Sequence, residues 1–173
     1  MKDLIYNQRQ IPKEKWRYGL RSSAAVGCGW IATHNALRLM GYQTDIDGLI
    51  RYYESMLPLI HGNAGTSFWG PAVCLKNWGF PVELCFQVSR FDEIAKNSDV
   101  CILFYHWHRQ YKLGAHFIAL QKTADGIIGY NTYRNSDGPD RLGPSLEGFI
   151  RDKGHFGCVL IGIRKKEEPH TEF

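Results

Sequence analysis

The sequence predicts a single α+β domain, in which helices dominate the first half of the chain and an antiparallel sheet the second. Apolar residues recur with helical spacing before residue 80, and short β-branched and aromatic runs follow it. Between two such runs, Asp125-Gly126 is typical of a hairpin turn. The 173 residues, 44% of them hydrophobic, contain no linker, repeat or low-complexity tract. We therefore expect one domain over residues 1–173, with an N-terminal arm at 1–21 and a frayed tail at 165–173.

The predicted helices follow from periodicity and from their end signals. In the third of them, Thr66 or Ser67 is the expected N-cap, Pro71 lies in the first turn and Gly79 ends the helix. A glycine, Gly41, also follows the first helix as a stop signal. The helices are expected at residues 28–40, 45–57, 66–79 and 89–97, with a short helix or turn at 145–154.

The predicted strands are short and rich in branched and aromatic residues. The run at 100–106 is apolar, β-branched and aromatic up to His106, as expected for a buried strand in the middle of a sheet. Segments 115–122 and 127–133 flank the Asp125-Gly126 turn and should pair as a hairpin. Further strands are expected at residues 81–88 and 156–165.

Charge and composition exclude several classes of protein. The net charge is +4, and the surplus Lys and Arg residues lie within residues 1–21, which we expect to be a solvated basic arm. Nucleic-acid binding requires a denser basic stripe, so no nucleic-acid partner is expected. No apolar run is long enough to cross a membrane, and the first residues have no apolar signal-peptide core. We expect no membrane insertion; the oligomeric state is not predicted.

The five cysteines show no paired spacing, which argues against a disulfide framework and against a structural zinc site. We therefore expect a cytoplasmic protein with reduced thiols and no cofactor, while export by another route stays open. Four of the cysteines lie in apolar segments and are interpreted as packing residues: Cys74, Cys85, Cys101 and Cys158.

Cys28 differs from the other cysteines because it lies between Gly27 and Gly29, where a small-residue loop enters a predicted helix. A thiol attacks as the thiolate, and the N–H groups at a helix start stabilise an anion. We expect this position to lower the Cys28 pKa and to make it a nucleophile. The alternative is a structural cysteine in a well-packed helix start.

A nucleophilic cysteine requires a base, and His116 is the leading candidate because it opens an apolar strand. His106 and His108 are an alternative base or a weak metal pair. The hairpin turn brings residues 131–133 opposite His116. We therefore expect the Asn131 side chain to accept a hydrogen bond from His116 Nδ1, leaving the other ring nitrogen to Cys28. Asn131 is alternatively a turn residue.

In chain order the sequence carries "YNQ" ending at residue 8, "YG" at 18–19, "SS" at 22–23, "GCG" at 27–29, "GTS" at 65–67 and "GAHF" at 114–117. With Trp16, this order resembles the papain-like cysteine peptidases, and most closely their bacterial bacteriocin-processing (double-glycine leader) branch. The resemblance covers roughly residues 6–163. It implies a papain-like fold, with N-terminal helices packed on a C-terminal antiparallel sheet.

The resemblance also implies roles for individual residues. Cys28 would be the nucleophile, His116 the general base and acid, Asn131 the orienting residue and Gln8 an oxyanion-hole donor. Relatives often have the Gln six residues before the Cys, where this chain has Ser22, so Gln10 is a rival. Two further departures are Trp30, which either narrows the cleft or is a buried aromatic residue, and Asn131-Thr132 in place of the usual Asp-Pro.

The resulting hypothesis is a cysteine peptidase that hydrolyses a peptide or amide bond of a peptide or protein substrate through a Cys28 acyl-enzyme. An acyltransferase of transglutaminase-like chemistry would use the same residues. A non-catalytic peptide-binding domain of the same fold is the third interpretation, and the sequence alone does not decide among the three.

Overall fold

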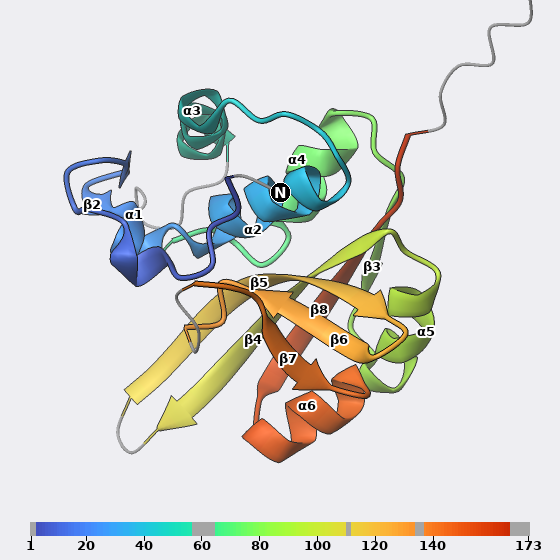
Figure 1. The fold of residues 1–173 in the computed structure, drawn as a ribbon. Helices are drawn as coiled ribbons and strands as arrows, with labels where there is room; N and C mark the ends of the chain where they lie inside the picture. The colour runs from blue at the N-terminus through green and yellow to red at the C-terminus, as the bar shows by residue number, and fades with distance from the viewer. Residues whose placement is uncertain (1–2, 57–64, 110–111, 134–136, 167–173) are drawn as a thin grey trace, which may run out of the picture.

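The computed structural model describes residues 3–56, 65–109, 112–133 and 137–166, and it is built around one antiparallel sheet with helices on both faces (Figure 1). Helices α2 and α4 cover one face, with α1 and α3 beside them, and α5 and α6 cover the other. The helices span α1 (Ser23–Val26), α2 (Cys28–Leu39), α3 (Ile46–Met56), α4 (Gly70–Asn77), α5 (Phe91–Lys96) and α6 (Leu146–Lys153).

The sheet has six strands in the order β3-β8-β4-β5-β6-β7, and every neighbouring pair is antiparallel. Its strands span β3 (Val82–Cys85), β4 (Val100–Arg109), β5 (Lys112–Thr123), β6 (Gly126–Tyr130), β7 (Asp140–Gly143) and β8 (Phe156–Ile163). The N-terminal region adds a small ribbon, β1 (Arg17–Tyr18) with β2 (Arg21–Ser22), and the 3-10 turn η1 (Gln8–Gln10); a second 3-10 turn, η2 (Val88–Arg90), precedes α5.

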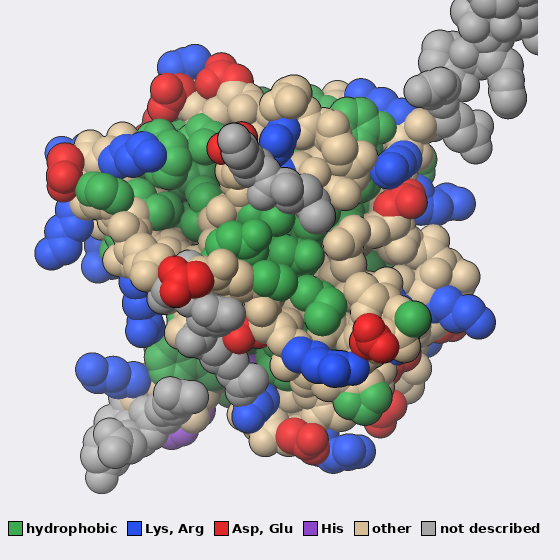
Figure 2. All heavy atoms as spheres, viewed as in Figure 1, with side chains coloured by type: hydrophobic (Ala, Val, Ile, Leu, Met, Phe, Trp, Pro, Cys, Tyr) green, Lys and Arg blue, Asp and Glu red, His purple; other side chains and the backbone are tan. Residues whose placement is uncertain are grey.

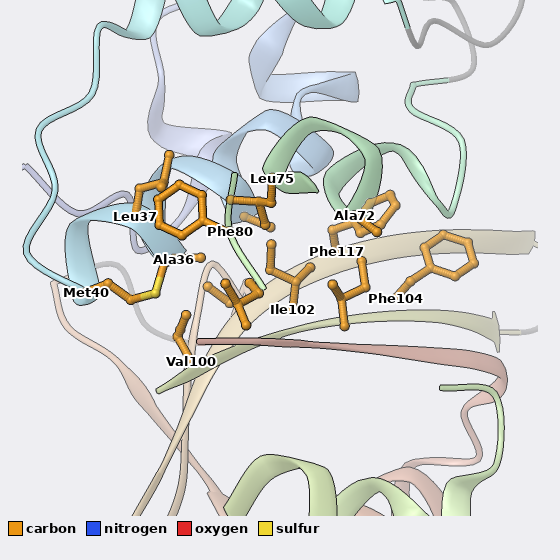
Figure 3. Packing of buried hydrophobic residues seen from close by; sticks show 14 of the residues in the cluster. Ala36, Leu37, Met40, Ala72, Leu75, Phe80, Val100, Ile102, Phe104 and Phe117 are labelled. Atoms are coloured by element: carbon orange, nitrogen blue, oxygen red, sulfur yellow. The ribbon is translucent and has the colours of Figure 1, made fainter. Parts of the chain in front are cut away.

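The core divides by the alternation of side chains along the strands. Ile102 and Phe117 point toward α2 and α4, where they meet Ala36 and Leu75 (Figure 3). The intervening residues of the same strands, such as Ile118, pack beneath α5 and α6. Because successive strand residues face opposite sides, β4 and β5 contribute to both layers. On one face of the surface, hydrophobic side chains gather at the junction between the helical layer and the sheet (Figure 2).

Most predicted elements are found close to their predicted positions. The first helix runs from Cys28 to Leu39, and the hairpin has the predicted turn, with Thr123 paired to Gly126. The third helix is an exception because it begins at Gly70 instead of at Thr66 or Ser67. The Thr66 hydroxyl is bonded to the Tyr18 hydroxyl at 3.0 Å, so this tertiary contact occupies the group expected to cap the helix.

The N-terminal segment is more ordered than a solvated arm. The basic residues that the structure describes in it are exposed, but Gln8, Ile11 and Tyr18 are buried in the domain. Patterning did not predict η1, β1, β2, α1 or β7, which are too short to show a period. Of the predicted tail, residues 167–173 lie outside the described residues, as do His61 and His170. Within the described ranges, none of the helices has the length and apolar character that a membrane crossing needs.

Candidate functional site

Cys28 is the first residue of α2 and is partly exposed. Backbone N–H groups of Phe117, Cys28 and Gly29 lie close enough to its sulfur to stabilise a thiolate. Burial of the sulfur outweighs them and raises the Cys28 pKa to about 11. The predicted lowering of this pKa is therefore wrong, because desolvation of the sulfur is a larger effect than the helix N-terminus.

His116 lies on β5 and is almost fully buried. Its Nε2 donates a hydrogen bond of 2.6 Å to the main-chain carbonyl of Asn131. A carbonyl only accepts, so this bond places the ring proton on Nε2 and a lone pair on Nδ1. Nδ1 is buried and has no hydrogen-bond partner among the described residues. Burial also lowers the His116 pKa to about 4, so the ring is neutral at pH 7 and has an available basic nitrogen.

The segments that carry Cys28 and His116 lie together where α2 packs on β5. Phe117, whose N–H faces the Cys28 sulfur, shares a peptide bond with His116. The predicted roles of the two ring nitrogens are reversed, since Nε2 and not Nδ1 bonds Asn131. The acceptor is also the main-chain oxygen of Asn131 instead of its side chain.

The Asn131 side chain is bonded to Gln8, more than 120 residues away in the sequence. Its Oδ1 accepts from the Gln8 main-chain N–H at 2.8 Å, and its Nδ2 donates to Gln8 Oε1 at 2.9 Å. Asn131 adopts a left-handed conformation, φ 65°, which asparagine tolerates better than most residues. The Gln8 pair holds this strained residue, and Asn131 in turn holds the His116 ring through its carbonyl.

Gln8 is fully buried beside Asn131, whereas its rival Gln10 is exposed. One hydrogen of Gln8 Nε2 is directed to the Ala24 carbonyl at 3.3 Å. A primary amide has two such hydrogens, so one donor of Gln8 is left for another acceptor.

Tyr133 is part of the site although the motifs did not indicate it. Its ring stacks on His116 with 4.1 Å between centroids and 24° between planes. The Arg9 guanidinium lies 4.3 Å from the centroid of the same ring. The hairpin register, in which Ala119 pairs with Tyr130, brings residue 133 opposite residue 116 when extended. Continuing the hairpin pairing three residues beyond Tyr130 was therefore the sequence signal that could have indicated Tyr133.

Several of the sequence motifs converge on the start of α2. Thr66, bonded to Tyr18, packs against Gly29 so closely that a Cβ on Gly29 would lie 2.6 Å from Thr66 Oγ1. Ser23 accepts a hydrogen bond of 3.1 Å from the indole N–H of Trp30. Trp30 is fully buried, so it belongs to the core and does not narrow a cleft.

The remaining candidates have other surroundings. His106 stacks on Phe156 at the end of β4, and His34 is bonded to Thr44 and to the Asp3 carbonyl. Among the described residues, no group of three or more His, Cys, Asp or Glu side chains is arranged to hold a metal ion. The other four cysteines are buried free thiols, as expected for packing residues.

No protein-family model and no curated protein matches the chain. Among solved structures, the chain is similar to the peptidase domain of Streptococcus ComA, a bi-functional ABC transporter involved in a quorum-sensing pathway. The TM-score is 0.53 at 15% sequence identity, over 80% of this chain and 91% of that domain. The fold is papain-like. At this identity the similarity concerns the fold alone, so the chemistry of the site is argued from its own residues.

Proposed function

We propose that the chain is a cysteine peptidase that cleaves a peptide or amide bond with Cys28 as the nucleophile and His116 as the base. The observation that carries the proposal is the neutral His116 ring. Its Nε2 is fixed on the Asn131 carbonyl, and its lone pair on Nδ1 is buried without a partner on the strand that faces the Cys28 sulfur. His106 Nδ1 is also buried without a hydrogen-bond partner among the described residues, so the distinguishing feature of His116 is its place next to Phe117, whose N–H faces the Cys28 sulfur.

In the proposed reaction, the Cys28 thiol transfers its proton to His116 Nδ1 as the sulfur attacks the substrate carbonyl carbon. The tetrahedral intermediate then breaks its C–N bond, and His116 returns the proton to the departing amine. Water adds to the resulting thioester, again giving its proton to Nδ1. As the C–S bond breaks to release the acid, the Nδ1 proton returns to the Cys28 sulfur and restores the thiol. The Asn131 carbonyl stabilises the ring while it is charged.

The oxyanion of the intermediate is assigned to the Cys28 main-chain N–H and to the second hydrogen of Gln8 Nε2. A single donor of this kind contributes roughly 10²–10³ in rate. Gln8 therefore has two proposed functions, since its remaining polar atoms hold Asn131.

The pH dependence of Cys28 alkylation by iodoacetamide, followed by mass spectrometry, tests the Cys28–His116 pair. If His116 takes the proton as the sulfur attacks, wild type gains a reaction component that is constant between pH 6 and 8, because the ring is neutral above its pKa of about 4. The wild-type rate should therefore depend less on pH than the rate of His116→Gln, which keeps a donor for the Asn131 carbonyl but reacts only through the free thiolate, whose fraction increases about tenfold per pH unit below the thiol pKa. The four buried cysteines are internal controls for folding.

Equal pH profiles in wild type and His116→Gln would contradict the pair and would favour a non-catalytic peptide-binding domain. Hydrolysis itself is tested by digesting a peptide library in ¹⁸O-labelled water. New carboxyl termini should carry the label in wild type and be absent in Cys28→Ala. Products joined to an added primary amine instead of to water would identify an acyltransferase.

A further inference from the structure

A pocket of about 340 Å³ lies beside the candidate site, against the Tyr133 ring that stacks on His116. Three of its lining residues lie one or two positions after residues of the proposed site in the chain. Arg9 follows Gln8, while Thr132 and Tyr133 follow Asn131. The same backbone segments therefore position the pocket and the site, and the volume is that of a small ligand-binding pocket.

The described lining of this pocket is basic and aromatic, with no acidic side chain. Arg9 and Lys153 are its permanent cations, and neither forms an ion pair with any acid that the structure describes. Nearby, the Asp140 carboxylate accepts a hydrogen bond from the Thr132 hydroxyl and does not line the pocket. Two cations that share a concave site without an internal counter-ion favour an anionic ligand.

The positive charge of the pocket acts on the site. After burial, the charges of Arg9 and His155 are among the causes that lower the His116 pKa, and both residues line the pocket. An anion bound there would offset part of this charge and stabilise the protonated ring that forms during the reaction.

The position of the pocket also indicates which part of a substrate it would hold. His116 protonates the leaving amine in the proposed mechanism, so the leaving group lies on the His116 side of the scissile bond. Tyr133, whose ring stacks on His116, lines the pocket, so the pocket is next to His116 and on this side. Residues that follow the scissile bond would therefore enter it.

We infer that this pocket binds a carboxylate of the peptide substrate on its leaving-group side, through Arg9 and Lys153, while the aromatic walls hold the adjoining apolar atoms. This inference rests on the proposed function for the identity of the ligand as a peptide. The carboxylate is that of an acidic side chain or of the C-terminus, since both present the same group to the two cations.

Binding is measured with the full chain carrying Cys28→Ala, so that the result does not depend on catalysis. The first probes are N-acetyl-tyrosine and N-acetyl-tyrosine amide, which share a ring and differ in the carboxylate. By isothermal titration, the carboxylate should bind at least about tenfold more tightly, as a charge-assisted hydrogen bond provides. The second pair, N-acetyl-glutamyl-tyrosine amide and its glutaminyl counterpart, places the carboxylate on a side chain.

The preference should fall to less than about twofold in Arg9→Gln/Lys153→Gln and fall partly in Lys153→Gln alone, whose exposed site on α6 tolerates the change. The control Lys13→Gln/Lys96→Gln removes the same charge from exposed positions outside the pocket and should keep the preference. The pair that shows the preference identifies its source.

No preference in either pair, or an equal loss in the control variant, would overturn the inference. The probes bind without reacting. If they show no carboxylate preference while wild type hydrolyses peptides through Cys28, only the assignment of the pocket is wrong. If the pocket prefers the carboxylate but Cys28 is unreactive, the anion-binding pocket is supported and the proposed peptidase function is wrong.

Discussion

His116 links the site to the pH dependence of folding. Burial lowers its pKa from 6.5 to about 4, so between these values the unfolded chain binds more protons than the folded one. The stability associated with the neutral ring is complete above pH 6.5 and is lost as the pH falls toward 4, by roughly 3 kcal/mol in all.

Urea unfolding of wild type and His116→Gln at pH 7.0, 6.0 and 5.0 measures this linkage. The difference in unfolding free energy between the two proteins should change progressively over this range, with wild type losing more stability toward low pH. Carboxylates titrate in both proteins, so their contribution to the pH dependence of the unfolding free energy cancels in this difference. A difference independent of pH would mean that the ring is not desolvated as described.

At the scale of elements, the start of α2 depends on its close contact with the segment that precedes α4. A Cβ at Gly29 would lie 2.6 Å from Thr66 Oγ1 and 2.7 Å from its Cβ, too close for any real side chain. Gly29→Ala should therefore displace Thr66, break its bond to Tyr18 and destabilise the protein by roughly 1–3 kcal/mol.

Chemical denaturation of Gly29→Ala, Thr66→Gly and the double variant tests this contact. If the clash is the cause, the double variant should be more stable than the sum of the single effects indicates, because Thr66→Gly removes the atoms in the way. Additive effects would show that Gly29 is needed for another reason. Ala24→Gly, a small-residue change in α1, is a control that does not alter this contact.

At the scale of the whole molecule, the first eleven residues complete the domain. The Ile5 main chain is bonded twice to the buried Asn35 side chain of α2, at 2.9 and 2.8 Å. Gln8 contributes both bonds that hold Asn131. Deleting residues 1–11 leaves these buried partners unsatisfied, and we expect a loss of roughly 3–5 kcal/mol.

Thermal unfolding of this deletion should show a clearly lower midpoint, and Cys28 alkylation at pH 7 should slow as His116 loses its support. Deleting residues 167–173, which lie outside the described residues, is the matched control at the other end of the chain. An unchanged midpoint in the N-terminal deletion would instead support the solvated arm that the charge pattern predicted for residues 1–21.

Signals that act between neighbouring residues predicted their elements closely, whereas features that depend on distant contacts were missed or assigned wrongly. The glycine pair around Cys28, the Gly41 stop and the Asp125-Gly126 turn are local, so the helix and the hairpin were predicted closely. The cap assigned to Thr66 or Ser67 was wrong because α4 begins at Gly70: the Thr66 hydroxyl is bonded to the distant Tyr18, and Ser67 Oγ has no hydrogen-bond partner among the described residues. Tyr133 was missed because its role comes from register and stacking, which no short motif carries.

The sequence by itself determined the α+β order, the place of Cys28 at a helix start and the pairing of the His116 strand with the segment of Asn131. These follow from periodicity and turn chemistry, which act between neighbouring residues. Only the tertiary structure decided which nitrogen of His116 is bonded, that Gln8 locks Asn131, and that the Cys28 pKa is raised and not lowered. Those outcomes depend on desolvation and on contacts between segments as far apart as 123 residues, and local pattern carries no information about either.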